Sequence, residues 1–304
     1  MTDFAAMSAE IRQLAGERGA LILAHNYQRA EVQDVADFVG DSLGLSRQAA
    51  ETDAAVIVFA GVHFMAETAK ILAPEKTVLL PEPSAGCPMA DMITGEALVA
   101  WKAEHPGVPV VTYVNSSAEV KAESDVCVTS ANAVNVVRAL GASRILFAPD
   151  KNLGSWVARS LPDVEVMLWE GWCPRHHDVT VEQVLDARRA HPDAAVIMHP
   201  ECRPEVVDLA DAVLSTSQML SYAAASDAEE FIVVTEAGLI HGLEKAAPGK
   251  RFYELYPRIL CKNMKVTTLQ KVRDCLAYLT GEVLVPEEIR VRALTAVERM
   301  VAIG

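Results

Sequence analysis

Three short apolar runs of the sequence end in polar residues and recur at a nearly constant interval. They are residues 20–27, which end in His25-Asn26-Tyr27, residues 108–115, which end in Tyr113-Val114-Asn115, and residues 194–201, which end in His199-Pro200-Glu201. The distance along the chain is 88 residues from His25 to Tyr113 and 86 residues from Tyr113 to His199. Matching segments at a fixed period indicate an internal repeat of one supersecondary unit.

Three more β-prone segments follow in the same order in each repeat. The second segments are residues 38–42, 126–130 and 212–216, the third are 54–59, 144–147 and 230–234, and the fourth are 77–80, 164–169 and, less clearly, 251–256. The stretches between them carry helical periodicity, as in Val134, Val137 and Leu140. Short apolar strands that alternate with helices are typical of a parallel sheet, so the pattern predicts an α/β fold.

The repeat predicts three αβα units at residues 18–98, 99–183 and 184–266. Each should hold a short four-stranded parallel sheet with helices on both faces, and a pseudo-threefold axis should relate the units around a central site. Residues 5–17 and 267–304 lie outside the units and have amphipathic helical patterns, the second with Leu269, Val272, Leu276 and Leu279 on one face. Chance spacing within one long sheet is the alternative, and four elements kept in register across three units disfavour it.

Composition and charge narrow the classes of partner. Of the 304 residues, 51% are apolar and 22% are charged, which is typical of a globular protein rather than a disordered one. The net charge of −14, without a long basic run, argues against nucleic acid or an anionic membrane as the main partner. The sequence begins without a signal-peptide pattern and lacks an apolar stretch of membrane-spanning length, so we expect a cytoplasmic protein.

One cysteine follows the fourth predicted strand of every unit. These residues are Cys87, Cys173 and Cys261, at steps of 86 and 88 residues. Loops after parallel strands lie at the carboxyl edge of a sheet, so the three thiols should meet near the axis. Three converging thiolates suit a soft metal ion or an iron–sulfur cubane, and a cubane so held keeps one iron open for a substrate. A structural zinc with His176 as fourth ligand is the alternative.

The other three cysteines lack this relationship. The chain has six cysteines and none forms a close CxxC pair, so a disulfide framework is not indicated. Cys127 lies within a predicted strand, and Cys202 and Cys275 have no counterpart in the other repeats. We expect these three to be ordinary buried side chains.

Polar residues gather at the same predicted edge as the thiols. His25, Tyr27, Tyr113, Asn115, His199 and Glu201 stand at the tips of first strands. Ser42, Ser130 and the run Ser215-Thr216-Ser217 stand where a second strand passes into a helix. Hydroxyl groups at such junctions are often simple N-caps, whereas the helix start can also bind a carboxylate or phosphate. Both interpretations stay open. GxGxxG, Walker A and HExxH motifs are absent, so nucleotide-binding and metalloprotease functions lack support.

Five motifs together resemble the quinolinate synthase family. They are His25-Asn26-Tyr27-Gln28, Gly86-Cys87-Pro88-Met89-Ala90, Tyr113-Val114-Asn115, Cys173-Pro174-Arg175-His176 and His199-Pro200-Glu201-Cys202, and the resemblance covers essentially the whole chain. It implies three αβα domains about a pseudo-threefold axis and a central, oxygen-sensitive [4Fe-4S] cluster. It also implies a transferase of NAD biosynthesis that condenses iminoaspartate with dihydroxyacetone phosphate to quinolinate, with loss of phosphate and water. An aspartate-oxidising enzyme would supply the iminoaspartate.

The resemblance assigns a role to each matching residue. Cys87, Cys173 and Cys261 correspond to the cluster ligands, and Tyr27 and Glu201 to residues of proton transfer. The positions that bind substrates are His25, Ser42, Tyr113, Asn115, Ser130, His199, Glu201 and Thr216. Some family members have CxxCxxC at the last ligand, whereas this chain has Cys261-Lys262-Asn263-Met264, which removes a thiol–disulfide switch there. For Glu201 we expect partial burial to raise the pKa toward neutrality.

Two functions of other classes remain open. An aconitase-like [4Fe-4S] hydro-lyase would use the same open iron without dihydroxyacetone phosphate. A non-enzymatic iron–sulfur sensor is the second alternative, and the lack of a basic element suited to binding DNA argues against it.

Overall fold

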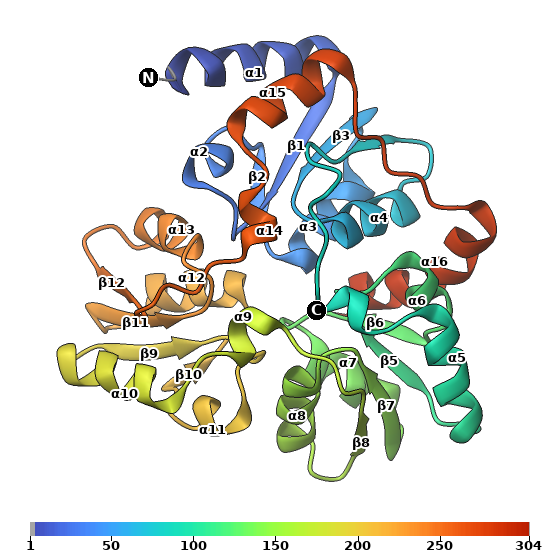
Figure 1. The fold of residues 1–304 in the computed structure, drawn as a ribbon, viewed down its shortest axis with the longest axis vertical. Helices are drawn as coiled ribbons and strands as arrows, with labels where there is room; N and C mark the ends of the chain where they lie inside the picture. The colour runs from blue at the N-terminus through green and yellow to red at the C-terminus, as the bar shows by residue number, and fades with distance from the viewer. Residues whose placement is uncertain (1–3, 304) are drawn as a thin grey trace.

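The computed structural model describes residues 4–303 and contains three separate four-stranded sheets (Figure 1). The first has β1 (Ala20–His25), β2 (Phe38–Gly40), β3 (Val56–Ala60) and β4 (Thr77–Leu79); the second has β5 (Val110–Tyr113), β6 (Val126–Val128), β7 (Arg144–Ala148) and β8 (Glu165–Leu168); the third has β9 (Ala195–Met198), β10 (Ala212–Val213), β11 (Glu230–Val234) and β12 (Arg251–Glu254). All strand pairs within the sheets are parallel, and the order is β2-β1-β3-β4 and its equivalents. The predicted α/β fold with a repeated four-stranded parallel sheet is confirmed.

Helices connect the strands and flank each sheet. The helices of the first unit and its N-terminal extension are α1 (Phe4–Arg18), α2 (Ala30–Gln33), α3 (Ser42–Glu51), α4 (His63–Leu72) and the 3-10 helix η1 (Ala90–Met92). Those of the second are α5 (Gly95–Glu104), α6 (Ala118–Ala122), α7 (Ala133–Leu140), α8 (Lys151–Ser160) and α9 (Pro174–His177). The remaining helices are α10 (Val181–Ala190), α11 (Pro204–Val207), α12 (Thr216–Ala225), α13 (Leu239–Ala246), α14 (Lys262–Lys265), α15 (Leu269–Tyr278) and α16 (Glu287–Ala302).

Strand β1 shows why the first strands are apolar along their whole length. Successive side chains of a strand point to opposite faces of the sheet. Ile22 and Ala24 pack with residues of α1 and α15, whereas Leu23 packs with residues of α3 and α4 on the other face. Because helices cover both faces, neither face can be polar, and the sequence is a continuous apolar run.

An aspartate marks the same place in each unit. The residue before each second strand accepts a hydrogen bond from a backbone N–H of the first strand, at 2.7 Å in all three units: Asp37 from Ile22, Asp125 from Val110 and Asp211 from Val196. This repeated hydrogen bond holds the first and second strands in one relative position. The units therefore repeat in their side-chain contacts as well as in their strand order.

The C-terminal helices bind the units together. Helix α15 packs against α1 and β3 on the first sheet, and α16 packs against α4 of the first unit and against α6 and β6 of the second. The predicted apolar face of α15 is confirmed for Leu269, Val272 and Leu276, which are buried. It is wrong for Leu279, which follows the helix in the left-handed conformation, with a φ of 51°, and is 40% exposed.

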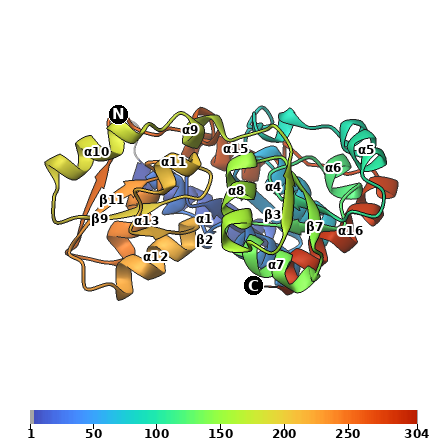
Figure 2. The same cartoon turned by 90° about the horizontal axis from the view of Figure 1, so that it is seen from below.

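The three sheets surround the centre of the molecule, and the short helices α9 and α14 lie close to that centre (Figure 1). At a right angle to this view the third unit stands beside the second, with α9 between them (Figure 2). Each sheet lies within one of the ranges 18–98, 99–183 and 184–266, whose limits as domains stay a prediction. Of the helices in residues 4–303, none has the length and apolar character needed to cross a bilayer.

Candidate active site

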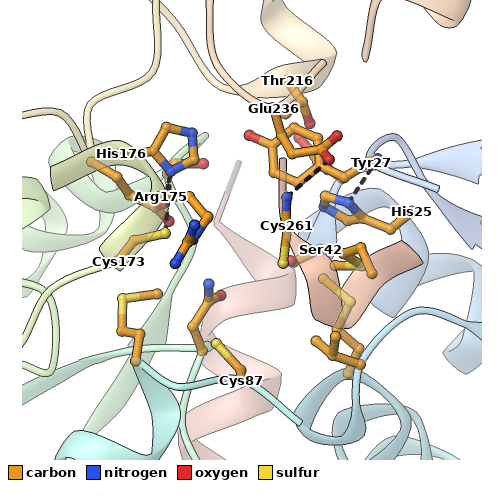
Figure 3. A pocket seen from close by; sticks show the side chains of 18 of the residues that line it. His25, Tyr27, Ser42, Cys87, Cys173, Arg175, His176, Thr216, Glu236 and Cys261 are labelled. Atoms are coloured by element: carbon orange, nitrogen blue, oxygen red, sulfur yellow. Dashed lines mark hydrogen bonds and ion pairs between the residues drawn. The ribbon is translucent and has the colours of Figure 1, made fainter. Parts of the chain in front are cut away.

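One cavity at the centre collects side chains from all three units (Figure 3). The structure brings together every residue to which the motifs assigned a ligand, binding or proton-transfer role. The cavity is lined by Cys87, Cys173, Cys261, His25, Tyr27, Ser42, Tyr113, Asn115, Ser130, His199, Glu201 and Thr216. The carboxyl edges of three parallel sheets converge here, which is why residues far apart in the sequence share one site.

The three thiols have equivalent surroundings. Cys173 and Cys261 precede α9 and α14 directly, Cys87 lies just before η1, and the three side chains face a common space in Figure 3. Backbone N–H groups of the following turn donate to each sulfur, from Met89 and Ala90 to Cys87, from His176 to Cys173, and from Asn263 and Met264 to Cys261. Such groups stabilise a thiolate, but they do not overcome desolvation. Burial raises the pKa of Cys87 to about 12 and also raises the pKa of Cys173 and Cys261.

This donor set suits a cluster better than a single zinc ion. Thiols with raised pKa values become thiolates when a metal binds them. Four ligands of one tetrahedral zinc would place the sulfurs within about 4 Å of one another. In residues 4–303 the one group of metal-ligating atoms found within 4.8 Å of one another is Cys173, His176 and Glu201, which contains a single cysteine. The three thiols therefore do not form a group as compact as the ligands of one zinc ion.

Glu201 lies at the meeting point of the polar residues. Its side chain is 4% exposed; Tyr113 OH donates to Oε1 at 2.7 Å, and His176 Nδ1 lies 2.7 Å from Oε2. Burial alone would raise the pKa of Glu201, but the imidazoles of His199 and His176 and the hydrogen bonds from His176 and Tyr113 outweigh burial and lower that pKa. The expected upward shift is therefore wrong, because His176 and Tyr113 from the second unit join the neighbouring His199 at this carboxylate.

A chain of hydrogen bonds connects Glu201 with Tyr27. Because a carboxylate only accepts, His176 Nδ1 donates to Glu201, and its Nε2 lies 2.9 Å from Thr235 Oγ1. Thr235 Oγ1 lies 2.5 Å from Tyr27 OH. The two residues with expected proton-transfer roles are thus joined through His176 and Thr235. Sequence reasoning considered His176 only as a zinc ligand and missed Thr235, whose signal is its place directly after β11.

His25 and His199 occupy equivalent positions and are held in the same way. The N–H of Tyr27 donates to His25 Nδ1 at 3.1 Å, and the N–H of Glu201 donates to His199 Nδ1 at 3.4 Å. Each imidazole therefore presents Nε2 to the cavity, and His199 Nε2 lies 3.2 Å from Ser130 Oγ. Burial lowers the pKa of His25 to about 3 and that of His199 to about 4, so both are neutral near pH 7.

The hydroxyl residues at the helix starts are not the capping residues. Asp41 caps α3 through a 2.9 Å hydrogen bond from the N–H of Gly44, and Ser215 caps α12. Ser42 and Thr216 are the first helical residues and line the cavity instead. The N-cap interpretation is therefore wrong for Ser42 and Thr216 and confirmed for Ser215. Thr216 Oγ1 also accepts a hydrogen bond from Asn26 Nδ2 at 2.9 Å, which ties the first unit to the third.

Charged residues that the motif roles did not include also line the cavity. They are Asp41, Arg175 and Glu236. Arg175 belongs to the Cys173-Pro-Arg-His176 motif and extends into the space shown in Figure 3. Among the described residues that line the cavity it is the one arginine or lysine, so it provides a local positive charge in a chain of net charge −14.

Comparison with known proteins bears on the whole chain. The family model described as quinolinate synthetase A protein matches residues 9–302. A protein named quinolinate synthase from Geobacter sp. (strain M21) is 56% identical over 297 residues, covering 98% of this chain and 97% of that protein. A quinolinate synthase from Dehalococcoides mccartyi (strain CBDB1) is 56% identical with 98% of both chains covered, and one from Thermodesulfovibrio yellowstonii is 53% identical with 97% of both covered.

Proposed function

The chain belongs to the quinolinate synthase family, and on that premise we propose that it condenses iminoaspartate with dihydroxyacetone phosphate to form quinolinate. Phosphate and water leave, and the enzyme acts as a transferase in NAD biosynthesis. The observation that supports this most is the single cavity in which three periodic thiols meet the polar strand tips of all three units. Such a cavity suits a small polar substrate beside a metal cluster.

We propose that Cys87, Cys173 and Cys261 hold a [4Fe-4S] cluster. Three protein thiolates on a cubane leave one iron open, which supplies a Lewis acid for a substrate hydroxyl or carboxylate. The backbone N–H groups that point at each sulfur would hold the thiolates in the form that binds iron. The buried Met89 and Met264 beside the thiols would keep bulk water from the cluster.

Binding of two anionic substrates falls to hydroxyl residues that follow the second strand of each unit, at the start of α3 and α12 and in the turn before α7. Ser42, Ser130 and Thr216 come from different units and line one cavity, so together they can bind carboxylate and phosphate oxygens and bring the two molecules into one geometry. Arg175 adds a cation that attracts anions against the negative field of the chain. His25 and His199, being neutral, can donate from Nε2 to substrate oxygens.

Proton transfer is proposed for Glu201 and Tyr27. The lowered pKa keeps Glu201 ionised near neutral pH, so its carboxylate can accept a proton at Oε2 if a substrate replaces one of its present donors. Burial raises the pKa of Tyr27, so its phenol stays protonated and can donate from OH. The hydrogen bonds through His176 and Thr235 offer a path along which the proton that Glu201 accepts can replace the proton that Tyr27 donates.

The chemistry of the first substrate implies a supplier. An imine of aspartate is hydrolysed by water, so it must reach the cavity soon after it forms. We infer that an aspartate-oxidising enzyme supplies iminoaspartate directly to this protein.

A condensation assay tests the proposed function. Protein purified without oxygen should form quinolinate from freshly made iminoaspartate, and only when dihydroxyacetone phosphate is present. Dehydration of a hydroxy acid without dihydroxyacetone phosphate would favour a hydro-lyase. A protein with an intact cluster and no turnover of either kind would contradict the enzymatic proposal.

A further inference from the structure

The loops that carry the three cysteines are paired with a second loop in the same way. In each unit, the third residue after the third strand donates its backbone N–H to a backbone carbonyl. That carbonyl belongs to the residue two positions before the cysteine. The pairs are His63 with Ala85 at 2.8 Å, Lys151 with Gly171 at 2.9 Å and Ala237 with Ile259 at 2.9 Å. The residues just before these donors, Val62, Asp150 and Glu236, therefore occupy equivalent positions beside the cysteine loops.

In the second unit this position holds a carboxylate with no exposed surface. Asp150 Oδ1 accepts a hydrogen bond from the N–H of Leu153 at 2.7 Å, in the first turn of α8. Asp150 Oδ2 accepts one from the N–H of Cys173 at 3.0 Å. One carboxylate thus joins the start of a helix to the backbone of a proposed cluster ligand.

The third unit has the same arrangement with a longer side chain. Glu236 is also fully buried, and its Oε2 accepts from the N–H of Gly238 at 2.6 Å, while Oε1 accepts from the N–H of Cys261 at 3.1 Å. Lys265, in the helix that follows Cys261, forms an ion pair with Glu236 at 3.0 Å. Two residues of different length therefore reach the same backbone atom of equivalent cysteines, which chance contacts would not produce.

The first unit differs because Val62 has no acceptor. Its cysteine loop is held from outside the unit, since Asn263 Nδ2 donates to the carbonyl of Gly86 at 2.8 Å. Asn263 lies two residues after Cys261, so the first cysteine loop is attached to the third. Support of the first loop therefore passes through the loop that Glu236 holds.

We propose that Asp150 and Glu236 are positioning residues that hold the backbone of Cys173 and Cys261 in the geometry that binds the cluster. The inference rests on the proposed cofactor and adds two residues that none of the motifs contains. Residues that orient metal ligands typically change metal affinity or activity by about 10–100-fold when they are replaced. Both carboxylate oxygens are needed, because each receives a different backbone N–H.

The amide variants Asp150→Asn and Glu236→Gln test this with little change of shape. An amide has one acceptor oxygen, so its NH2 group must face one of the two backbone N–H groups, either at the helix start or at the cysteine. The matched control is Asp125→Asn, because Asp125 also accepts a buried backbone N–H but bonds Val110 rather than a cysteine. Asp125 accepts this one backbone N–H, which the oxygen of an asparagine can still accept, so Asp125→Asn reports the effect of exchanging a carboxylate for an amide away from the thiols.

The measurement is the rate at which iron passes from the anaerobic holoenzyme to a ferrous chelator. Asp150→Asn and Glu236→Gln should each release iron about 10–100-fold faster than wild type, with altered electron paramagnetic resonance of the reduced cluster. Asp125→Asn should leave the release rate and the resonance unchanged. Should Asp150→Asn fail to fold, Glu236→Gln decides the outcome alone.

Two results would overturn the inference, and they differ in meaning. If both amide variants release iron within about twofold of wild type, or no faster than Asp125→Asn, the carboxylates do not position the ligands although the cofactor stands. If wild-type protein contains no iron and sulfide, the proposed cofactor fails and the positioning role fails with it.

Discussion

Replacement of Glu201 by Gln separates proton transfer from binding. The Gln side chain keeps the length of Glu201, and its oxygen can still accept from Tyr113 OH, now 2.7 Å from Oε1. Its NH2 group would face His176 Nδ1, now 2.7 Å from Oε2. The imidazole can answer by moving its proton to Nε2, which then donates to Thr235 Oγ1. The surrounding hydrogen bonds therefore survive the substitution, and only those of His176 reverse direction.

The expected size of the effect follows from this geometry. Since Tyr113, His176 and Thr235 each keep a hydrogen bond, the free energy of unfolding should change by about 1 kcal/mol. Loss of a general base lowers kcat by roughly 10²-fold or more, which corresponds to about 2.7 kcal/mol or more in the barrier. Removal of a binding contact alone would instead raise KM.

The assay is anaerobic steady-state kinetics of Glu201→Gln with both substrates varied, alongside the visible spectrum of the cluster. We expect kcat to fall by about 10²-fold with an unchanged spectrum and KM values close to those of wild type. A kcat within about threefold of wild type would refute the assignment of Glu201 as base. Tyr27 or His199 would then be the leading candidate.

Two further predictions concern binding and pH. Thr216→Ala should weaken substrate binding by about 1–3 kcal/mol while the cluster spectrum stays the same. An unchanged KM would show that Thr216 acts only through its hydrogen bond with Asn26, as a structural residue. The folded pKa values of about 3 for His25 and about 4 for His199 lie below the ordinary histidine pKa of 6.5. Unfolded chains therefore bind more protons between pH 6.5 and 4, so the cluster-free protein should lose about 1.4 kcal/mol per histidine between pH 8 and 5.5, measured by denaturant unfolding.

The repeat made much of the fold predictable. A period of 86 to 88 residues recurs at His25, Tyr113 and His199, and the same step separates the three cysteines. In a parallel sheet, the residues that follow each strand lie at the carboxyl edge of the sheet. A residue directly after a predicted strand is therefore expected at the edge where the site forms. For this reason every residue with an assigned ligand, binding or proton-transfer role lines the cavity, although the sequence alone shows no contact between units.

Contacts between units could not be predicted in this way. The pKa of Glu201 depends on His176 and Tyr113, which belong to the second unit, whereas Glu201 belongs to the third. Thr235 of the third unit likewise contacts His176 of the second and Tyr27 of the first, which the chain brings near only after the sheets assemble. Periodicity within a unit predicts its strands and carries no information about how side chains of neighbouring units meet.

The central claim is that three periodic thiols hold one cluster. Its most direct test is the iron and sulfide content of protein prepared without oxygen, for wild type and for Ser variants of single cysteines. Wild type should contain about four irons per chain, and Cys87→Ser, Cys173→Ser and Cys261→Ser should each lose the visible absorption and the activity. Cys127→Ser and Cys275→Ser should keep both. One zinc per chain in the wild type, or full activity in Cys173→Ser, would contradict the account.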